Sequence, residues 1–248
     1  MIKFISFDLD DTLWAIMPMI VHAEEKLQHW LGDHIPGYTE HITREELATL
    51  REAVLQESPS LRFDISSLRV RCIERAIARC YTLDSRDLKA SEITQKAAEA
   101  FDVFMQGRND VRFFPDALEV LADLRRRFRL CGLTNGNADT KRIGLDDYFD
   151  FCMSPVQAQA RKPDAAIFSA TLARAQCSAA EIIHVGDHPT EDIAGAKAAG
   201  WRAIWLRHEG LKGLDSRLTT DPQADATITT LNDLPAAISR IASLARSD

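Results

Sequence analysis

The 248-residue sequence is poor in cysteine, contains no long apolar run and has no excess of basic charge. Its five cysteines are scattered and form no C-x-x-C pair, which argues against a zinc site and against a disulfide framework. The formal net charge of −7 argues against a nucleic-acid-binding surface. No apolar segment approaches the roughly 20 residues of a membrane-spanning helix, and aspartates stand where a signal peptide needs its apolar region. We therefore expect a cytoplasmic protein with reduced thiols that binds no membrane and no nucleic acid, and no obligatory protein partner is indicated.

The order of the apolar patterns predicts an α/β fold that is interrupted by a helical block. The segment Ile2–Phe7 is short, β-branched and aromatic, which is typical of a buried strand. From residue 15 to residue 107 helical signals take over, among them the capping pattern Thr43–Glu46 with apolar residues at helical spacing behind it. Strands and helices then alternate, which indicates parallel strands with helices on both faces. Further strands are expected within residues 129–137, 149–154, 181–187, 201–206 and 226–231, and helices within 115–127, 163–175, 191–199 and 232–244.

This pattern predicts a Rossmann-like, doubly wound parallel sheet with an inserted all-helical domain. The α/β core is expected to comprise residues 1–14 and 108–248, and the inserted domain residues 15–107. The first strand precedes the helical block in the sequence but is expected to belong to the same sheet as the strands that follow the block. The two ends of the helical block are therefore expected to be linkers or hinges.

Polar side chains stand where four of the predicted apolar runs finish. They are Asp8 with Asp10, Thr134 with Asn135, Lys162 in the loop before a helix, and Asp187. In parallel α/β sheets ligands bind beyond the carboxyl ends of the strands. If these strands lie side by side, the polar side chains converge on one crevice.

The aspartates at this edge need a counter-charge. Two carboxylates about 4 Å apart repel by about 4 kcal/mol at an effective dielectric constant of 20, and Asp8, Asp10 and Asp187 would make three such pairs. Oxygen ligands favour Mg²⁺, so we interpret the cluster as a magnesium site, with Asp192 five residues beyond Asp187 as a further candidate ligand. The alternative is that the aspartates cap turns and helix ends.

The same residues suggest phosphoryl chemistry. Asp8, at the last strand position, suits a nucleophile that forms an aspartyl-phosphate, and Asp10 on the same side of the chain could donate and later accept a proton. Thr134 and Asn135 could bind phosphate through a hydroxyl and turn amides, and Lys162 could clamp an anion. Taken singly, the Thr-Asn-Gly segment is also explained by an ordinary turn and the lysine by solvation.

The motif Asp8–Thr12 (DLDDT) resembles the D-x-D-x-T signature of the haloacid dehalogenase superfamily of phosphatases. Thr134 corresponds to the second motif of that family, Lys162 to the third, and Asp187 with Asp192 to the fourth. The four motifs occur in order, and the resemblance covers nearly the whole chain. It implies a haloacid dehalogenase core with a helical cap, and so a phosphoric monoester hydrolase that acts on a small phosphate ester.

The resemblance also implies residue roles. Asp8 would be the nucleophile and Asp10 the general acid/base, while Thr134 and Lys162 would bind phosphate. Mg²⁺ would be held by Asp8, the Asp10 carbonyl and Asp187, with Asp192 in support. Dehalogenases proper lack an acidic residue at the position of Asp10, which disfavours halide chemistry. A broad-specificity sugar-phosphate or nucleotide phosphatase, a phosphomutase and a catalytically silent phosphate-binding protein of the same fold remain as alternatives.

Within this family the sequence is similar to bacterial phosphatases that act on flavin mononucleotide and on 5-amino-6-(5-phosphoribitylamino)uracil. The segments that carry this similarity are residues 133–151, 184–207 and 66–76. In such an enzyme Trp14 could stack on a planar substrate ring, or it could instead pack beneath the hinge. Arg62 and Arg69 flank an expected turn between helices and could reach a substrate.

Overall fold

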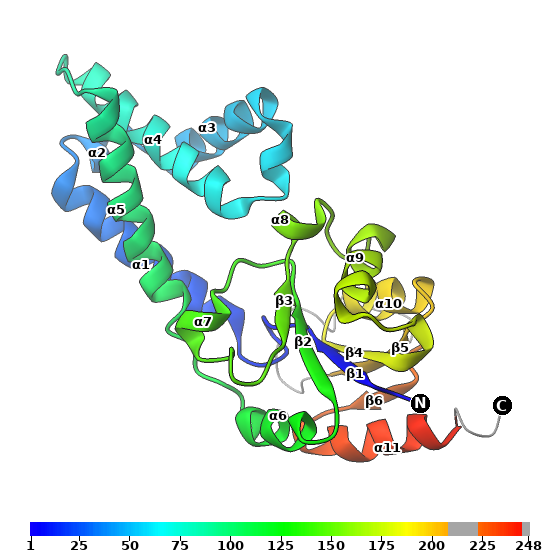
Figure 1. Cartoon of the computed structure of the whole chain (residues 1–248). Coiled ribbons are helices and arrows are strands. Elements are labelled where there is room, and N and C mark those ends of the chain that lie inside the picture. The colour runs from blue at the N-terminus through cyan, green and yellow to red at the C-terminus, as the bar shows by residue number, and fades with distance from the viewer. Residues whose placement is uncertain (208–222, 245–248) are drawn as a thin grey trace. The chain divides into compact units, whose positions relative to one another are not determined.

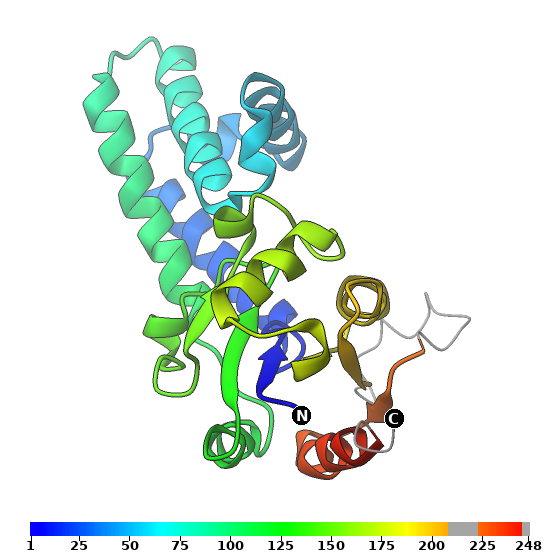
Figure 2. The same ribbon diagram turned by 45° about the vertical axis from the view of Figure 1, so that its right-hand side comes forward.

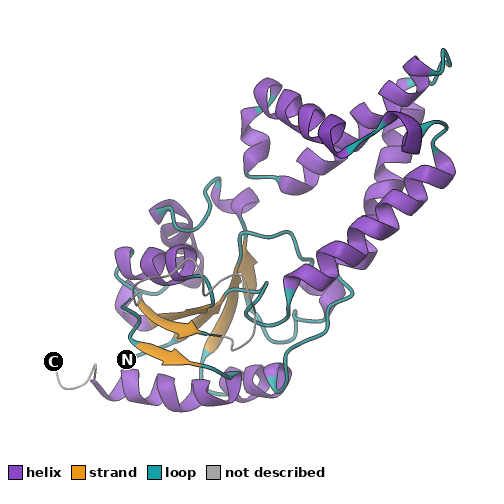
Figure 3. Ribbon diagram, turned by 180° about the vertical axis from the view of Figure 1, so that it is seen from behind, coloured by secondary structure: helices purple, strands orange, loops and turns teal. Residues whose placement is uncertain are grey.

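The structure is a computed structural model that describes residues 1–207 and 223–244. Packing divides the chain into two compact units: Met1–Ala15 with Arg112–Asp248, and Ile16–Val111. The described strands all lie in the first unit, whereas the second unit is built of helices (Figures 1 and 3). None of the helices in the described residues is long and apolar enough to cross a membrane. The assignment of the two units as a phosphatase core and its cap stays a prediction.

The first unit contains a parallel sheet of six strands in the order β3-β2-β1-β4-β5-β6. The strands are β1 (Phe4–Phe7), β2 (Arg129–Leu133), β3 (Phe151–Met153), β4 (Ile182–Gly186), β5 (Arg202–Leu206) and β6 (Ala226–Ile228). Phe7 of β1 pairs with Gly132 on one side and with Val185 on the other. The predicted α/β fold with a helical insertion is confirmed.

Helices cover both faces of the sheet, which explains why β1 and β4 are buried along their whole length. On one face α6 (Ala117–Arg125) packs beside α11 (Leu234–Leu244), and on the other lie α9 (Ala165–Ala175) and α10 (Gly195–Ala198), as Figure 2 shows. The core between the sheet and α9 includes Phe4, Leu133, Ile167, Phe168 and Trp201.

The four predicted helices of this unit begin at other residues than expected, and α6 and α11 each begin two residues later, at Ala117 and Leu234. α9 begins at Ala165 rather than at residue 163, because the Asp164 side chain caps the helix by accepting from the Ala166 amide at 2.9 Å. The helix expected at 191–199 is a π-helical turn, Pro189–Ala194 (η3), followed by α10. The short elements of this unit are α7 (Thr140–Ile143), α8 (Pro155–Ala158), η2 (Ala179–Glu181) and η5 (Leu231–Asp233).

The second unit is helical throughout, as the sequence predicts. Its helices are α1 (Ile16–His34), α2 (Tyr38–His41), α3 (Arg44–Glu57), η1 (Pro59–Arg62), α4 (Ile65–Leu83) and α5 (Ala90–Arg108). Thr43 caps α3 as predicted, accepting from the Glu46 amide at 3.1 Å. α1 and α5 pack closely at Gly107, where a Cβ atom would lie 2.7 Å from the Cα of Ala23. Leu27 and Phe104 belong to the core that this packing encloses.

Candidate active site

The three strands that lead to Asp8, Thr134 and Asp187 are neighbours in the sheet. β1 lies between β2 and β4 and all three run parallel, so their carboxyl ends meet at one edge. The ladder continues into the site, because the Asp8 amide donates to the Val185 carbonyl at 2.8 Å and the Thr134 amide to the Met153 carbonyl at 3.0 Å. Sheet hydrogen bonds therefore fix the backbone that carries Asp8 and Thr134.

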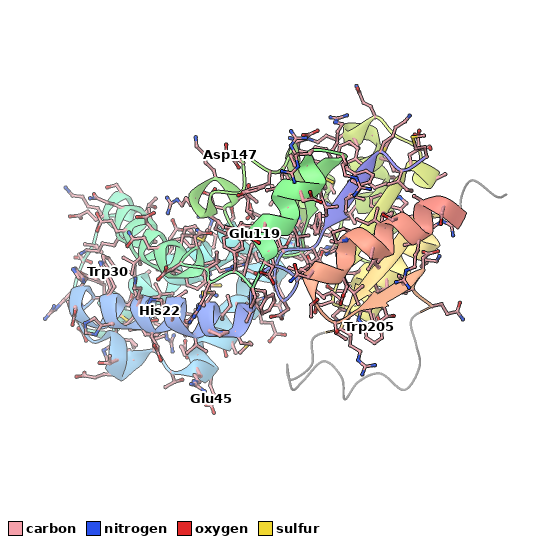
Figure 4. The ribbon with its side chains drawn as sticks, turned by 90° about the horizontal axis from the view of Figure 1, so that it is seen from below. His22, Trp30, Glu45, Glu119, Asp147 and Trp205 are labelled. Atoms are coloured by element: carbon pink, nitrogen blue, oxygen red, sulfur yellow. The ribbon has the colours of Figure 1, made fainter. Side chains whose placement is uncertain are left out.

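Asp8, Asp187 and Asp192 form a buried carboxylate cluster. One oxygen from each lies within 4.8 Å of the others. The Thr12 hydroxyl donates to Asp187 Oδ1 at 3.1 Å. The indole of Trp205, labelled in Figure 4, donates to the Asp187 carbonyl at 2.9 Å. The structure thus brings together three of the four aspartates that were expected at the metal site.

Lys162 lies between two members of this cluster, Asp8 and Asp192. Its Nζ donates to Asp8 Oδ1 at 2.6 Å, to Asp192 Oδ1 at 2.6 Å and to the Leu133 carbonyl at 2.7 Å. The residue is only 3% exposed, so these contacts replace its hydration. The remaining oxygen of Asp192 accepts from the His188 amide at 2.9 Å. The lysine and Asp192 therefore form a well-satisfied buried pair.

The charges of the cluster do not balance at neutral pH. Burial, reinforced by the neighbouring carboxylates, raises the pKa of Asp8 to about 8 and the pKa of Asp187 to about 9. Although burial opposes it, the Lys162 ammonium lowers the pKa of Asp192 below its usual range. One lysine thus compensates one carboxylate, and Asp8 and Asp187 need either protons or a further cation to be stable in this interior.

The donor set fits a hard divalent cation. The three clustered side chains offer carboxylate oxygens, which are the ligands that Mg²⁺ prefers. His184, which contacts Asp192, is fully buried, and this burial lowers its pKa, so it adds no positive charge at neutral pH. A divalent cation at this point would hold both Asp8 and Asp187 in the ionised form.

Asn135 holds the loops of the site together. Its Oδ1 accepts from the Lys162 amide at 2.9 Å, and its Nδ2 donates to the Lys162 carbonyl at 3.0 Å and to Glu191 Oε2 at 2.8 Å. The Thr134 hydroxyl accepts from the Gly136 amide at 2.9 Å and keeps its own proton as a donor. The side chain of Asn135 thus orients Lys162, and the roles of Thr134 and Asn135 in phosphate binding stay predictions.

Asp10 is held by Trp14 beside the cluster. The indole Nε1 donates to Asp10 Oδ1 at 2.9 Å, and the indole ring meets the Phe113 ring edge-on, with centroids 5.6 Å apart. Trp14 is 0% exposed, so the prediction that it stacks on a substrate ring is wrong, because a ligand cannot reach an enclosed indole. The alternative, a packing role, agrees with its position.

His184 is a site residue that sequence reasoning missed. It lies fully buried in β4, where its Nε2 is 3.0 Å from Asp192 Oδ1 and its Nδ1 is 3.1 Å from Ser6 Oγ. Because a carboxylate only accepts, Nε2 carries the proton and Nδ1 accepts from the serine hydroxyl. The apolar pattern of the strand predicts that His184 is buried. The pattern does not predict which side chains form hydrogen bonds with its ring.

The two arginines that could reach a substrate make contacts within the helical unit. Arg69 donates to Glu24 at 2.8 Å, and its guanidinium lies 3.8 Å from the centroid of the Phe104 ring. The Arg62 guanidinium lies 4.6 Å from the centroid of the Phe63 ring. A role of either arginine in substrate binding stays a prediction.

Known proteins resemble this chain over most of its length. A sequence profile of haloacid dehalogenase-like hydrolases matches residues 2–200. The 5-amino-6-(5-phospho-D-ribitylamino)uracil phosphatase of Escherichia coli K12 is 31% identical over 88% of this chain and 90% of its own. The phosphoserine phosphatase of Thermus thermophilus is 27% identical over 88% of this chain and 94% of its own.

A solved structure matches as well. The crystal structure of a 2-haloacid dehalogenase from Pseudomonas syringae pv. tomato is 40% identical, with a TM-score of 0.87, and covers 97% of this chain and 99% of its own. Together with the profile match, these relatives show the family. The chain belongs to the haloacid dehalogenase-like hydrolases and is a phosphatase of that family.

Proposed function

We propose that the protein is a Mg²⁺-dependent phosphomonoester hydrolase that forms an aspartyl-phosphate on Asp8, and that its substrate is flavin mononucleotide or 5-amino-6-(5-phosphoribitylamino)uracil. The observation that supports the chemistry is the buried cluster, in which Asp8 shares the Lys162 ammonium with Asp192 and lies beside Asp187. The relative from Escherichia coli, matched over most of both chains, supports the second of these substrates, 5-amino-6-(5-phosphoribitylamino)uracil.

The reaction proceeds in two displacements. An oxygen of Asp8 attacks phosphorus while the bond from phosphorus to the ester oxygen breaks, and Asp10 gives its proton to the departing alkoxide. Asp10 then takes a proton from a water molecule that attacks the aspartyl-phosphate, which releases inorganic phosphate and restores Asp8. Lys162 and Thr134 stabilise the negative oxygens of the phosphoryl group during both steps.

The metal would be held by the carboxylates of Asp8 and Asp187 and by the main-chain carbonyl of Asp10, with Asp192 in support. When bound, Mg²⁺ neutralises charge on the phosphoryl oxygens and keeps the buried carboxylates ionised. The support of Asp192 is indirect, because Lys162, His184 and the His188 amide already donate to its two oxygens.

Asp10 favours phosphoryl transfer over dehalogenation for this chain. A halide leaves without a proton, whereas the alkoxide of a phosphate ester needs a general acid. Asp10 follows Asp8 by two residues and is held by a buried hydrogen-bond donor. We therefore expect no halide release from 2-chloropropionate under conditions in which phosphate esters are hydrolysed.

The nucleophile is tested with Asp8→Asn in a p-nitrophenyl phosphate assay that contains Mg²⁺. We expect this variant to lose nearly all turnover, because an amide oxygen is a poor nucleophile, while an exposed control, Asp147→Asn (Figure 4), keeps the wild-type rate. Full activity of Asp8→Asn would show that another residue attacks phosphorus.

The substrate is tested by kcat/KM values for flavin mononucleotide, 5-amino-6-(5-phosphoribitylamino)uracil, phosphoserine, nucleotides and sugar phosphates. The proposal expects a value for one of the first two that is at least about tenfold above the others, since a difference of 1.4 kcal/mol in transition-state binding gives that factor. Equal values would indicate a broad-specificity phosphatase. Formation of an isomeric phosphate ester in place of free phosphate would indicate a mutase, and the absence of turnover on every ester a binding protein.

A further inference from the structure

The loop that carries Asp10 folds back on Trp14. The Asp11 amide donates to the Trp14 carbonyl at 2.7 Å, and the Leu13 amide donates to the Leu9 carbonyl at 2.8 Å. Asp11 adopts a left-handed conformation with φ of +58°, which closes the turn. Within this turn the Trp14 Nε1 donates to Asp10 Oδ1 at 2.9 Å. The indole ring is thus part of the same turn as the carboxylate that it contacts.

The indole is itself held firmly in the first unit. Trp14 is fully buried, it forms an antiparallel bridge with Phe113, and the Phe114 amide donates to the Leu13 carbonyl at 2.8 Å. The ring planes of Trp14 and Phe113 make an angle of 83°. Backbone pairing and edge-on ring packing therefore fix the direction in which the N–H group points.

We propose that Trp14 is the positioning residue of Asp10, an inference that rests on the proposed general acid/base role of that carboxylate. An indole N–H can only donate, so Oδ1 of Asp10 must present a lone pair to it. The carbonyl oxygen of a protonated carboxyl is a better acceptor than its hydroxyl oxygen, so this hydrogen bond favours the carbonyl form of Oδ1 and places the proton for the ester oxygen on Oδ2. Trp14 selects the oxygen that transfers the proton and keeps the carboxyl plane in one orientation.

This role concerns only the steps in which a proton is transferred. An alkyl phosphate must release an alkoxide and depends on the acid, whereas p-nitrophenolate is stable enough to leave without a proton. The ratio kcat/KM covers the reaction up to formation of the aspartyl-phosphate, so it reports the first proton transfer and excludes the hydrolysis of the intermediate. A positioning residue for the acid should therefore change kcat/KM in proportion to the basicity of the leaving group.

The test compares kcat/KM for flavin mononucleotide, glycerol phosphate and p-nitrophenyl phosphate in wild type, Trp14→Phe and Asp10→Asn. General acid catalysis contributes about 10²- to 10⁴-fold, and we expect Asp10→Asn to lose most of this factor on the alkyl esters. Trp14→Phe removes the N–H but keeps an aromatic ring. It should lose about tenfold or more on the alkyl esters, and less than about threefold on p-nitrophenyl phosphate.

Two controls separate positioning from packing. Phe113→Leu keeps the indole N–H and the backbone bridge to Trp14 and removes only the edge-on ring contact, so its loss of kcat/KM on the alkyl esters should be smaller than that of Trp14→Phe. Site-specific replacement of Trp14 by benzothienylalanine, which has sulfur in place of the N–H, keeps the shape of the ring and should reproduce the selective loss. This isosteric variant provides the answer if Trp14→Phe does not fold.

The outcomes distinguish the inference from the function on which it rests. If Asp10→Asn is selective for alkyl esters and both Trp14 variants lower all esters equally, the positioning role is overturned while the acid role stands. If Asp10→Asn itself shows no dependence on the leaving group, the acid role fails and the inference fails with it. Selective loss in Asp10→Asn and in both Trp14 variants supports the proposal.

Discussion

The replacement Lys162→Met tests the charge balance of the buried cluster. Methionine has nearly the length of lysine but no charge, so the substitution leaves the shape of the site largely unchanged. It removes the ammonium that donates to Asp8 and Asp192 at 2.6 Å each and to the Leu133 carbonyl at 2.7 Å. The carboxylates then face one another in an interior where Asp192 is 0% and Asp8 is 8% exposed.

The expected loss of stability is large. Removal of one partner from a buried ion pair costs about 3–5 kcal/mol, and the unsatisfied Leu133 carbonyl adds about 1 kcal/mol. In a chain of this size 1 kcal/mol lowers the melting temperature by about 2–4 °C, so a fall of about 10–20 °C is expected. Because protons or a divalent cation can replace the lost ammonium, the loss should be smaller at low pH and in the presence of Mg²⁺.

The measurement is thermal unfolding at neutral pH with EDTA, repeated with Mg²⁺. An exposed lysine in α7 provides the matched control, and Lys141→Met should change the unfolding free energy by less than about 0.5 kcal/mol. If Lys162→Met unfolds at the wild-type temperature in EDTA, the lysine does not stabilise ionised carboxylates, and the electrostatic reasoning is refuted. A loss that does not change with pH or with Mg²⁺ would point to packing instead.

Two further predictions concern the same cluster. In Gly186→Ala the new Cβ would lie 2.3 Å from Cγ of Asp192, so we expect a loss of about 1–3 kcal/mol and weaker Mg²⁺ binding by calorimetry. The control is Gly132→Ala, whose Cβ would lie 2.8 Å from the sulfur of Cys152. This variant should lose stability but bind Mg²⁺ as tightly as the wild type. Equal Mg²⁺ affinities of the two variants would contradict this reasoning. The second prediction is that the metal-free protein loses stability as the pH rises from about 5 to about 9. Burial raises the pKa values of Asp8 and Asp187 in the folded state to about 8 and about 9, so the stability that protonation provides is lost as the pH passes through these values. Thermal unfolding with EDTA and with Mg²⁺ checks this, and equal slopes in both conditions would contradict it.

The sequence predicted the fold and the elements that carry the site because both depend on local patterns. The buried strand before Asp8 and the alternation after residue 107 were sufficient to predict a parallel sheet with a helical insertion. The helix cap at Thr43 could also be predicted, because its hydrogen bond joins residues only three positions apart. The irregular turn Pro189–Ala194 was not, because a π-helical turn has the same apolar spacing as the beginning of an ordinary helix.

The prediction for Trp14 was wrong because the residues next to it in the sequence do not determine its contacts. A tryptophan just beyond a catalytic loop can contact a ligand or pack in the interior, and its neighbours in sequence are the same in both cases. The ring contact with Phe113 decides between them, and that residue is 99 positions away along the chain. His184 presents the same difficulty, because its second partner, Ser6, lies on a different strand.

What the sequence determined by itself is the inventory of the site: which carboxylates, which lysine and which hydroxyl stand at strand ends. Only the tertiary structure decided how they are paired. Lys162 donates to Asp8 and Asp192 but not to Asp187. The side chain of Asn135 forms hydrogen bonds with the backbone amide and carbonyl of Lys162. The physical reason is that hydrogen bonds act over about 3 Å, and the distances at which strand-end loops meet depend on strand order and packing, which no local pattern encodes.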